Sequence, residues 1–197
     1  MKEIILASNN VNKIEEIGNL LSDFDVKVRS LKELGLGDPI EDGKNFKENS
    51  IIKAKFGFEQ TGLPALADDS GFCVDSLNDF PGLCSARFQE ACGSYEEAFK
   101  VIDKCINPKN KNAHFVTSLA FVYKNATNDT IINTFEGKIE GEFIYPGRGN
   151  NGFGYCPVFL PNGYNQTFGE MDNDLRKSIN HRKIALDKFL EFFKTIA

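Results

Sequence analysis

Residues 63–74 read LPALADDSGFCV, and in this stretch two adjacent carboxylates, Asp68 and Asp69, separate two apolar runs. Both runs are typical of strands, so we expect the aspartates at a strand-to-loop junction. Neighbouring side chains on an extended backbone point to opposite faces. One carboxylate is therefore expected to face a ligand site, where it can hold a hard cation or accept a proton from water, while the other braces the loop. A solvated turn is the alternative, because Asp, Ser and Gly are common turn residues.

Hydrophobic periodicity predicts strands and helices along the rest of the chain. Strands are expected over residues 3–7, 25–29, 72–77, 115–123, 130–138 and 158–160. Helices are expected over residues 12–21, 44–60, 94–106 and 175–196. No repeat, low-complexity tract or interdomain linker interrupts the pattern, so we expect a single domain over residues 1–197.

Composition excludes several classes of protein. An apolar share of 41% and 18 Phe are typical of a globular chain, and a net charge of −5 argues against an extended nucleic-acid surface. No apolar run reaches the ~18 residues that span a bilayer, and the first residues are too short for a signal peptide, so a cytoplasmic location is expected. The five cysteines are widely spaced without a C-x-x-C pair, which predicts reduced and mostly buried thiols. Two histidines and no H-E-x-x-H motif argue against a zinc enzyme, while a Cys–His nucleophile pair stays open.

The first predicted strand runs into a polar turn that is a candidate phosphate site. Free backbone N–H groups at a helix start favour an anion, and a lysine within reach adds a point charge. An ordinary helix cap is the alternative, because Ser and Asn are preferred cap residues. The turn and its lysine are Ser8, Asn9, Asn10, Val11, Asn12 and Lys13.

A second glycine-rich stretch, residues 147–152, satisfies the dinucleotide pattern G-x-G-x-x-G. That pattern requires a helix after it, whereas an extended run follows here, so we reject a dinucleotide site. The glycines and the aromatic residues Phe153 and Tyr155 instead suit the approach of backbone atoms and a ring face to a flat ligand. A mobile surface loop is the alternative.

Two predicted helices carry polar residues at i and i+4, which places them on one face. Asn49 and Lys53 share a face of the second helix, near the oxygen ligands of Glu41 and Glu48. On the last helix the corresponding basic residues are Lys177 and His181, followed by Arg182. Solvated charged faces explain such patterns equally well.

Six segments in order along the chain resemble the inosine-triphosphate pyrophosphatase family. The opening Ser8-x-Asn10-x-x-Lys13 resembles the family's T/S-x-N-x-x-K, and Glu41 with F-K-E-N-S-I-I-K-A resembles its E…T-F-x-E-N-A-x-x-K-A helix. The segments A-D-D-S-G, P-G-L-C-S-A-R and G-F-G-Y are similar to family motifs at residues 67–71, 81–87 and 152–155. Residues 177–182 resemble K-S-x-x-S-H-R.

The resemblance implies an α/β fold in which helices flank a mixed central sheet, with two lobes, a cleft between them, and a homodimer. It implies hydrolysis of ITP, dITP or XTP to the monophosphate and pyrophosphate with Mg²⁺. Carried over by position, Glu41 and Asp69 hold the metal, and Asp69 also accepts the proton. Residues 8–13, Lys53 and Lys177 hold the phosphates, and the sugar and base are held by Ser70, Phe153, Gly154, Tyr155, Cys156, His181 and Arg182.

One departure concerns Cys156, which stands where the family's G-F-G-Y/W-D-P motif has an acid. A thiol supplies neither the charge nor the acceptors of a carboxylate, so an altered rate or base preference is expected. Three hypotheses therefore stay open: an enzyme for deaminated purine nucleotides, an enzyme for a different nucleotide, and a nucleotide-binding protein without catalysis.

Overall fold

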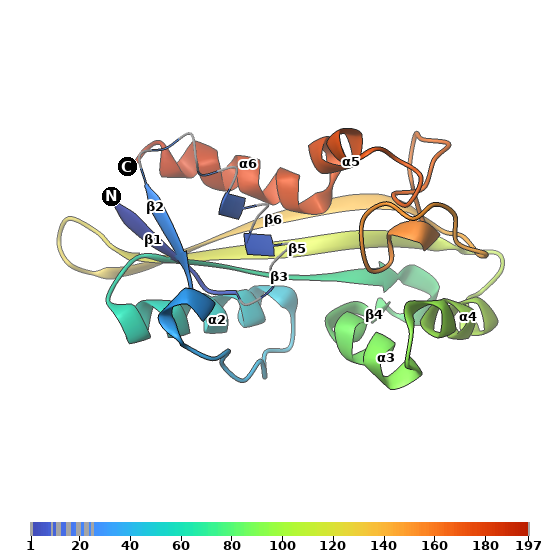
Figure 1. The fold of residues 1–197 in the computed structure, drawn as a ribbon, viewed down its shortest axis with the longest axis horizontal. Helices are drawn as coiled ribbons and strands as arrows, with labels where there is room; N and C mark the ends of the chain where they lie inside the picture. Colours follow the sequence, from blue (N-terminus) through green and yellow to red (C-terminus); the bar gives the residue numbers. More distant parts are fainter. Residues whose placement is uncertain are drawn as a thin grey trace. The chain divides into compact units, whose positions relative to one another are not determined.

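The computed structural model describes residues 2–8, 10, 13–14, 17–18, 21, 24 and 26–196. The helix predicted over residues 12–21 therefore lies partly outside the described residues. Figure 1 shows the strands and helices along the chain. The strands are β1 (Glu3–Leu6), β2 (Lys27–Ser30), β3 (Ala65–Val74), β4 (Phe80–Pro81), β5 (Asn112–Lys124), β6 (Thr130–Phe143) and β7 (Phe159–Pro161). The helices are α2 (Phe46–Thr61), α3 (Ser85–Cys92), α4 (Tyr95–Cys105), α5 (Asn173–Ile179) and α6 (His181–Phe193).

The strands form one mixed sheet in the order β2-β1-β3-β5-β6-β7, with β4 beside β3. Strand β1 runs parallel to β2 and β3, whereas β4 and β7 pair antiparallel with β3 and β6. The predicted mixed sheet flanked by helices is confirmed. Contacts divide the chain into unit 1 (Met1–Asp69, Thr117–Glu136, Ala185–Ala197) and unit 2 (Ser70–Val116, Gly137–Ile184). The single domain, the lobes and the cleft stay predictions.

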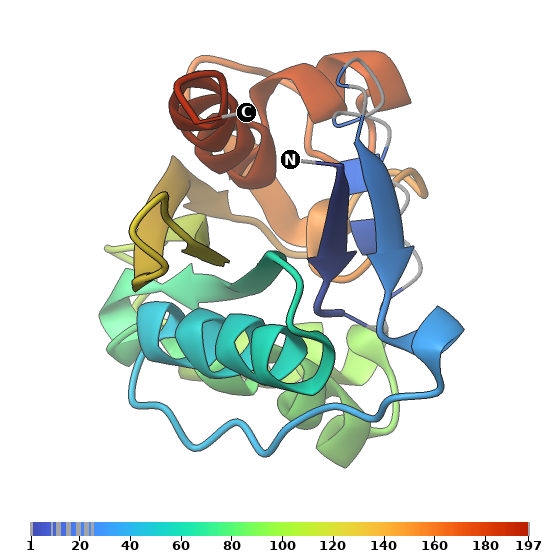
Figure 2. The ribbon, with the colours of Figure 1, turned by 90° about the vertical axis from the view of Figure 1, so that its left-hand side faces the viewer.

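Unit 1 has two apolar layers that follow the alternation of side chains along its strands. Ile4 and Leu6 of β1 pack with Phe189 of α6, whereas Ile5 of β1 packs with Ala54 of α2. Figure 2 shows α6 and α2 on opposite sides of the sheet. Among the described residues, no helix combines the length and the apolar character that crossing a membrane requires.

Helix α2 lies very close to the sheet at Gly57. A Cβ at this position would lie 3.1 Å from the Cβ of Ala7 and 3.3 Å from the Cβ of Ala65. The helix begins after Asn45, whose side chain accepts the N–H of Glu48 at 2.9 Å. Glu48 in turn accepts the N–H of Lys44 at 2.8 Å, so its carboxylate caps the helix and does not join the candidate ligand set.

Unit 2 is built around an aromatic cluster centred on Phe72. The ring of Tyr155 stacks on Phe72 with 4.9 Å between centroids, and Phe115 and Phe159 lie 5.1 Å and 6.2 Å from it. Such ring pairs stabilise a core by about 0.5–1.5 kcal/mol each beyond the area they bury. Phe99 of α4 belongs to the same cluster.

The predicted strand-to-loop junction at Asp68 and Asp69 is wrong. Strand β3 continues from Ala65 through both aspartates to Val74, and the extended run predicted to residue 77 gives way to a 3₁₀ helix at Asp75–Leu77. Turn propensity is a weak local preference, and pairing with neighbouring strands together with ion pairs to the acids outweighs it.

The single helix predicted over residues 175–196 is also wrong, because Asn180 interrupts it with an extended backbone (ψ 161°). The Asn180 side chain accepts the N–H of Lys183 at 2.7 Å and so caps α6. Lys177 and His181 consequently belong to different helices. The prediction that they share one helix face is therefore wrong.

Helix α3 was not predicted from the sequence. The burial of the cysteines also differs in part from the prediction. All five thiols are free, but only Cys73 and Cys156 are buried, while Cys84 and Cys105 are exposed. The expectation of mostly buried thiols is therefore wrong.

We predict that Gly57→Val lowers the free energy of unfolding by about 1–3 kcal/mol, because the added methyl groups overpack the contact between α2 and β1. Lys55→Val places the same side chain on an exposed position of α2 and is expected to change stability by about 0.5 kcal/mol or less. Urea unfolding measures both variants. Equal stability of the two variants would contradict the close approach at Gly57.

Candidate active site

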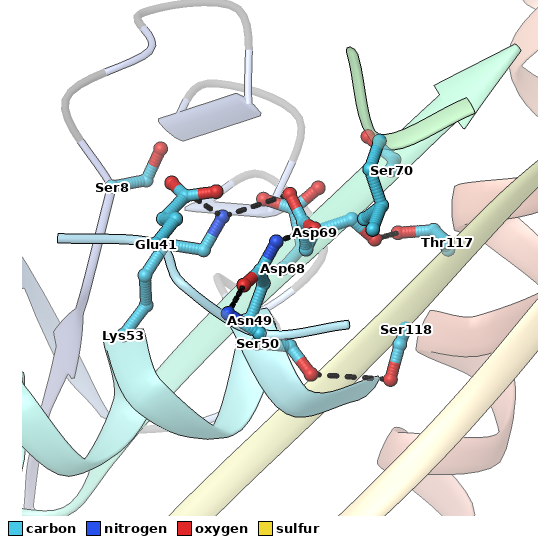
Figure 3. A network of polar contacts seen from close by, with 12 residues as sticks. Ser8, Glu41, Asn49, Ser50, Lys53, Asp68, Asp69, Ser70, Thr117 and Ser118 are labelled. Atoms are coloured by element: carbon cyan, nitrogen blue, oxygen red, sulfur yellow. Dashed lines mark hydrogen bonds and ion pairs between the residues drawn. The ribbon is translucent and has the colours of Figure 1, made fainter. Parts of the chain in front are cut away.

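Asp69 is the centre of a buried polar network in unit 1 (Figure 3). Its Oδ1 lies 3.0 Å from Nζ of Lys53, and its Oδ2 accepts Nδ2 of Asn49 at 3.2 Å. Both partners come from α2. The prediction that Asn49 and Lys53 share one face of this helix is confirmed, and that face lies against β3. The Thr117 hydroxyl of β5 also donates to the Asp69 carbonyl at 3.2 Å. The carboxylate is thus fixed through its side chain and its backbone.

Glu41 joins the same network from the segment that precedes α2. Its Oε1 lies 3.2 Å from Nζ of Lys53, so one ammonium bridges Glu41 and Asp69. Asn49 anchors this segment by accepting the N–H of Gly43 at 2.8 Å. A Cβ at Gly43 would lie 2.5 Å from Oδ1 of Asn49, so this approach requires glycine.

Asp68 forms an ion pair with a different lysine. Its Oδ2 lies 2.9 Å from Nζ of Lys13, and its side chain is fully buried. The two adjacent carboxylates thus form ion pairs with different lysines, and their placement on opposite faces of the strand stays a prediction. This ion pair links Asp68 of β3 to Lys13, which follows β1 in the chain.

Two hydrogen bonds of the type found in helix caps link the described residues that follow β1. Ser8 Oγ accepts the N–H of Asn10 at 3.2 Å, and Asn10 Oδ1 accepts the N–H of Lys13 at 3.3 Å. Phosphate binding by this turn stays a prediction. The predicted contacts of Asn9, Val11 and Asn12 lie outside the described residues.

Charge and burial oppose one another in this network. Burial alone would lower the pKa of Lys53, but Asp69, Asp68 and Glu41 together raise it above its ordinary value. Burial raises the pKa of the Asp69 carboxyl, and Lys53 opposes that shift. The acids Glu41, Asp68 and Asp69 outnumber the lysines Lys13 and Lys53 by one. This excess of carboxylate oxygens suits a hard divalent cation.

A second group of predicted site residues lies in unit 2. Arg182 donates from Nη2 to Oγ of Ser70 at 3.3 Å. The ring of His181 stacks on Phe115 with 5.0 Å between centroids and 13° between planes. The structure therefore brings Ser70 and Arg182 together, and His181 is held by an aromatic face beside Arg182.

The glycine-rich stretch ends with side chains in different environments. Tyr155 is buried in the aromatic cluster and donates its hydroxyl to the carbonyl of Ser85 at 2.9 Å, whereas Phe153 is 49% exposed. The ring face available to a ligand in this segment is therefore that of Phe153. Burial raises the pKa of the Cys156 thiol, and Arg176 opposes that shift.

Arg176 is a residue of this region that the sequence did not single out. A Cβ at Gly152 would overlap its guanidinium and would lie 2.8 Å from Sγ of Cys156. Arg176 also donates to Oδ1 of Asn173 at 2.9 Å. The predicted residue Lys177 is exposed. The sequence held no signal that Arg176, and not Lys177, lies beside Cys156, because this depends on the residue at which α5 begins.

The sequence profile of the Ham1 family matches residues 4–192. The chain belongs to the Ham1 family. The dITP/XTP pyrophosphatase of Zymomonas mobilis is 40% identical, covering 95% of this chain and 90% of that one. The solved HAM1 protein of Coxiella burnetii is 35% identical with a TM-score of 0.89, covering 99% and 100% of the two chains. The Ham1 protein of Staphylococcus aureus has a TM-score of 0.86 at 31% identity, covering 98% and 99%. These similarities confirm the family resemblance drawn from the sequence motifs.

We predict that Asn49→Asp in this Ham1 protein lowers the free energy of unfolding by about 1–3 kcal/mol. The substitution keeps the acceptor for Gly43 but replaces the donor to Asp69 with a second carboxylate. Asn112→Asp, on an exposed position of β5, makes the same chemical change and serves as the control. Thermal unfolding measures both. A loss of stability in the control as large as that in Asn49→Asp would contradict the role of Asn49.

Proposed function

We propose that this Ham1 protein hydrolyses non-standard purine nucleoside triphosphates (ITP, dITP and XTP) to the monophosphate and pyrophosphate. The observation that carries the proposal is the buried carboxylate of Asp69, held by Lys53 and Asn49 beside a second acid, Glu41. Relatives named dITP/XTP pyrophosphatase, at 40% identity over nearly the whole chain, support it.

In the proposed reaction Asp69 accepts a proton from the water that attacks the phosphate chain. Its raised pKa suits a general base, because a more basic carboxylate takes a proton more readily. Lys53 and Lys13 supply positive charge for the phosphates, together with the turn at residues 8–13 and Lys177. Phosphoryl transfer depends mainly on positioning and charge neutralisation, which such groups provide.

We further propose Mg²⁺ as the cofactor, with Glu41 and Asp69 as its ligands. The two carboxylates both lie beside the Lys53 ammonium, so their hard oxygen donors are near enough to one another for a cation to bind between them once Lys53 turns to the phosphates. A bound Mg²⁺ would neutralise phosphate charge during the reaction.

The proposed base pocket uses Ser70, His181, Arg182 and the segment 153–156. Hypoxanthine and xanthine carry a carbonyl acceptor at the 6-position, where adenine carries an amino donor. A donor such as Arg182 would pair with the carbonyl of hypoxanthine or xanthine, whereas the amino group of adenine would face it unpaired. Each unpaired buried group costs about 1–3 kcal/mol, which is enough to discriminate between the bases.

The assembly and the location of the enzyme also stay proposals. We expect a homodimer in the cytoplasm, where the nucleotide pool is. A nucleotide-binding protein without catalysis is a second candidate, favoured by the replacement of the family acid by Cys156.

We predict pyrophosphate release from ITP, dITP and XTP in the presence of Mg²⁺, with kcat/KM about 10- to 100-fold above that for ATP. Chromatography of the nucleoside monophosphates that form gives the rate of hydrolysis, and hence kcat/KM, for each substrate. Asp69→Asn is expected to lower kcat by about 10²- to 10⁴-fold. Asp38→Asn, at an exposed position, is the control and should leave kcat unchanged. Comparable turnover of ATP and ITP would contradict the proposed selectivity, and nucleotide binding without turnover would favour the second candidate.

We predict that Cys156→Asp raises kcat/KM for ITP by about tenfold, because a carboxylate beside the Arg176 guanidinium restores a charge-assisted contact. Cys156→Asn has nearly the same shape without the charge and is expected to stay near the parent value. Steady-state kinetics compare the three proteins. Unchanged or reduced activity in Cys156→Asp would show that the missing acid does not limit this enzyme.

A further inference from the structure

Three side chains of types that bind transition metals gather in unit 2. They are Cys73 on β3, Asp79 in the turn between β3 and β4, and His114 on β5. One donor atom from each residue lies within 4.8 Å of the other two. Cys73 and His114 are buried and Asp79 is exposed, so the cluster reaches from the core to the surface.

The imidazole of His114 is held in one orientation by a carboxylate. Its Nδ1 lies 3.1 Å from Oδ1 of Asp75, and its Nε2 lies 3.9 Å from Oδ1 of Asp79. A carboxylate that accepts one ring N–H and leaves the other nitrogen to a metal is the usual arrangement around metal-binding histidines. Nε2 is therefore the nitrogen that His114 presents to the cluster.

The short hairpin between β3 and β4 returns Asp79 towards Cys73. Cys73 pairs with Pro81 and Val74 pairs with Phe80 across this hairpin. The N–H of Asp79 donates to the carbonyl of Val74 at 3.1 Å, which closes the turn. The backbone thus places a carboxylate from the turn beside a thiol from the preceding strand.

We propose that Cys73, His114 and Asp79 bind one divalent transition-metal ion of the Zn²⁺ type, with Asp75 as the positioning residue of His114. A thiolate and an imidazole favour Zn²⁺ over Mg²⁺, which prefers oxygen ligands alone. Donor atoms around tetrahedral zinc are about 3.5 Å apart, given bond lengths of about 2.0–2.3 Å. The exposed Asp79 side chain, with 68% of its surface accessible, is free to close the remaining distance.

The charges around the cluster suit a cation. The carboxylates of Asp75 and Asp79 lie beside the cluster, and Lys138, whose charge also acts on the Cys73 thiol, forms an ion pair with Glu140 at 2.8 Å. Burial raises the pKa of the free Cys73 thiol to about 12, so the metal-free protein holds a neutral thiol there. Metal binding would replace that proton. This donor set is chemically distinct from the oxygen ligands proposed at Glu41 and Asp69.

The test is titration of the metal-free full-length protein with Co²⁺, which replaces Zn²⁺ and reports a thiolate ligand by a sulfur-to-cobalt charge-transfer band. We expect the band to saturate at one equivalent, to disappear on adding Zn²⁺, and to persist in excess Mg²⁺. Cys73→Ser is expected to abolish the band. Asp75→Asn is expected to weaken Co²⁺ binding by about 10- to 100-fold, as loss of a carboxylate behind a metal-bound histidine does.

Cys105→Ser removes an exposed thiol of α4 and is the matched control, which should keep the full band. Asp79→Asn alters only an exposed side chain, so weaker Co²⁺ binding by this variant tests the third ligand without endangering the fold. Absence of the band in the parent protein, or its survival in Cys73→Ser, would overturn the proposal. Hydrolysis of ITP with Mg²⁺ by Cys73→Ser is measured in parallel, and its retention would show that the two sites are separate.

Discussion

The ammonium of Lys53 between two carboxylates is the interaction on which the candidate active site depends. It holds Asp69 of the sheet and Glu41 of the segment before α2 at one point, at 3.0 and 3.2 Å. A buried acid is costly unless it is paired, so this contact permits the Asp69 carboxylate where a core would otherwise exclude it, while Glu41 stays exposed. Close packing at Gly57 brings α2 near enough for Lys53 to reach the strand. Asn49, one turn earlier on α2, donates a hydrogen bond to the second carboxylate oxygen of Asp69.

The parts of this arrangement that follow from periodicity could be predicted. Asn49 and Lys53 were placed on one face because helices repeat every 3.6 residues, and both meet Asp69. The continuity of β3 through Asp68 and Asp69 could not be predicted in this way, since it depends on partners such as Lys13 that come from distant parts of the chain. The interruption at Asn180 likewise depends on a single side chain that caps the following helix.

The cluster of Cys73, Asp79 and His114 shows a different limit of sequence reasoning. Metal sites are recognised in sequences by short, regular spacings, and these three residues have none. Two lie on neighbouring strands, β3 and β5, and the third lies in a turn that folds back on β3. The few histidines argued against a zinc enzyme, and the proposed ion has no part in the proposed hydrolysis. Only the pairing of the strands brings these donors together.

The two acids bridged by Lys53 are carried by backbone of unequal rigidity. Asp69 lies inside a strand of ten residues, whereas Glu41 belongs to an irregular segment tied to α2 through Gly43. Segments with few ladder hydrogen bonds open at lower free energy than the middle of a sheet. Mild denaturant would therefore release Glu41 while Asp69 keeps its place. Partial loosening of the protein would thus cost it one of the two carboxylates well before the chain unfolds.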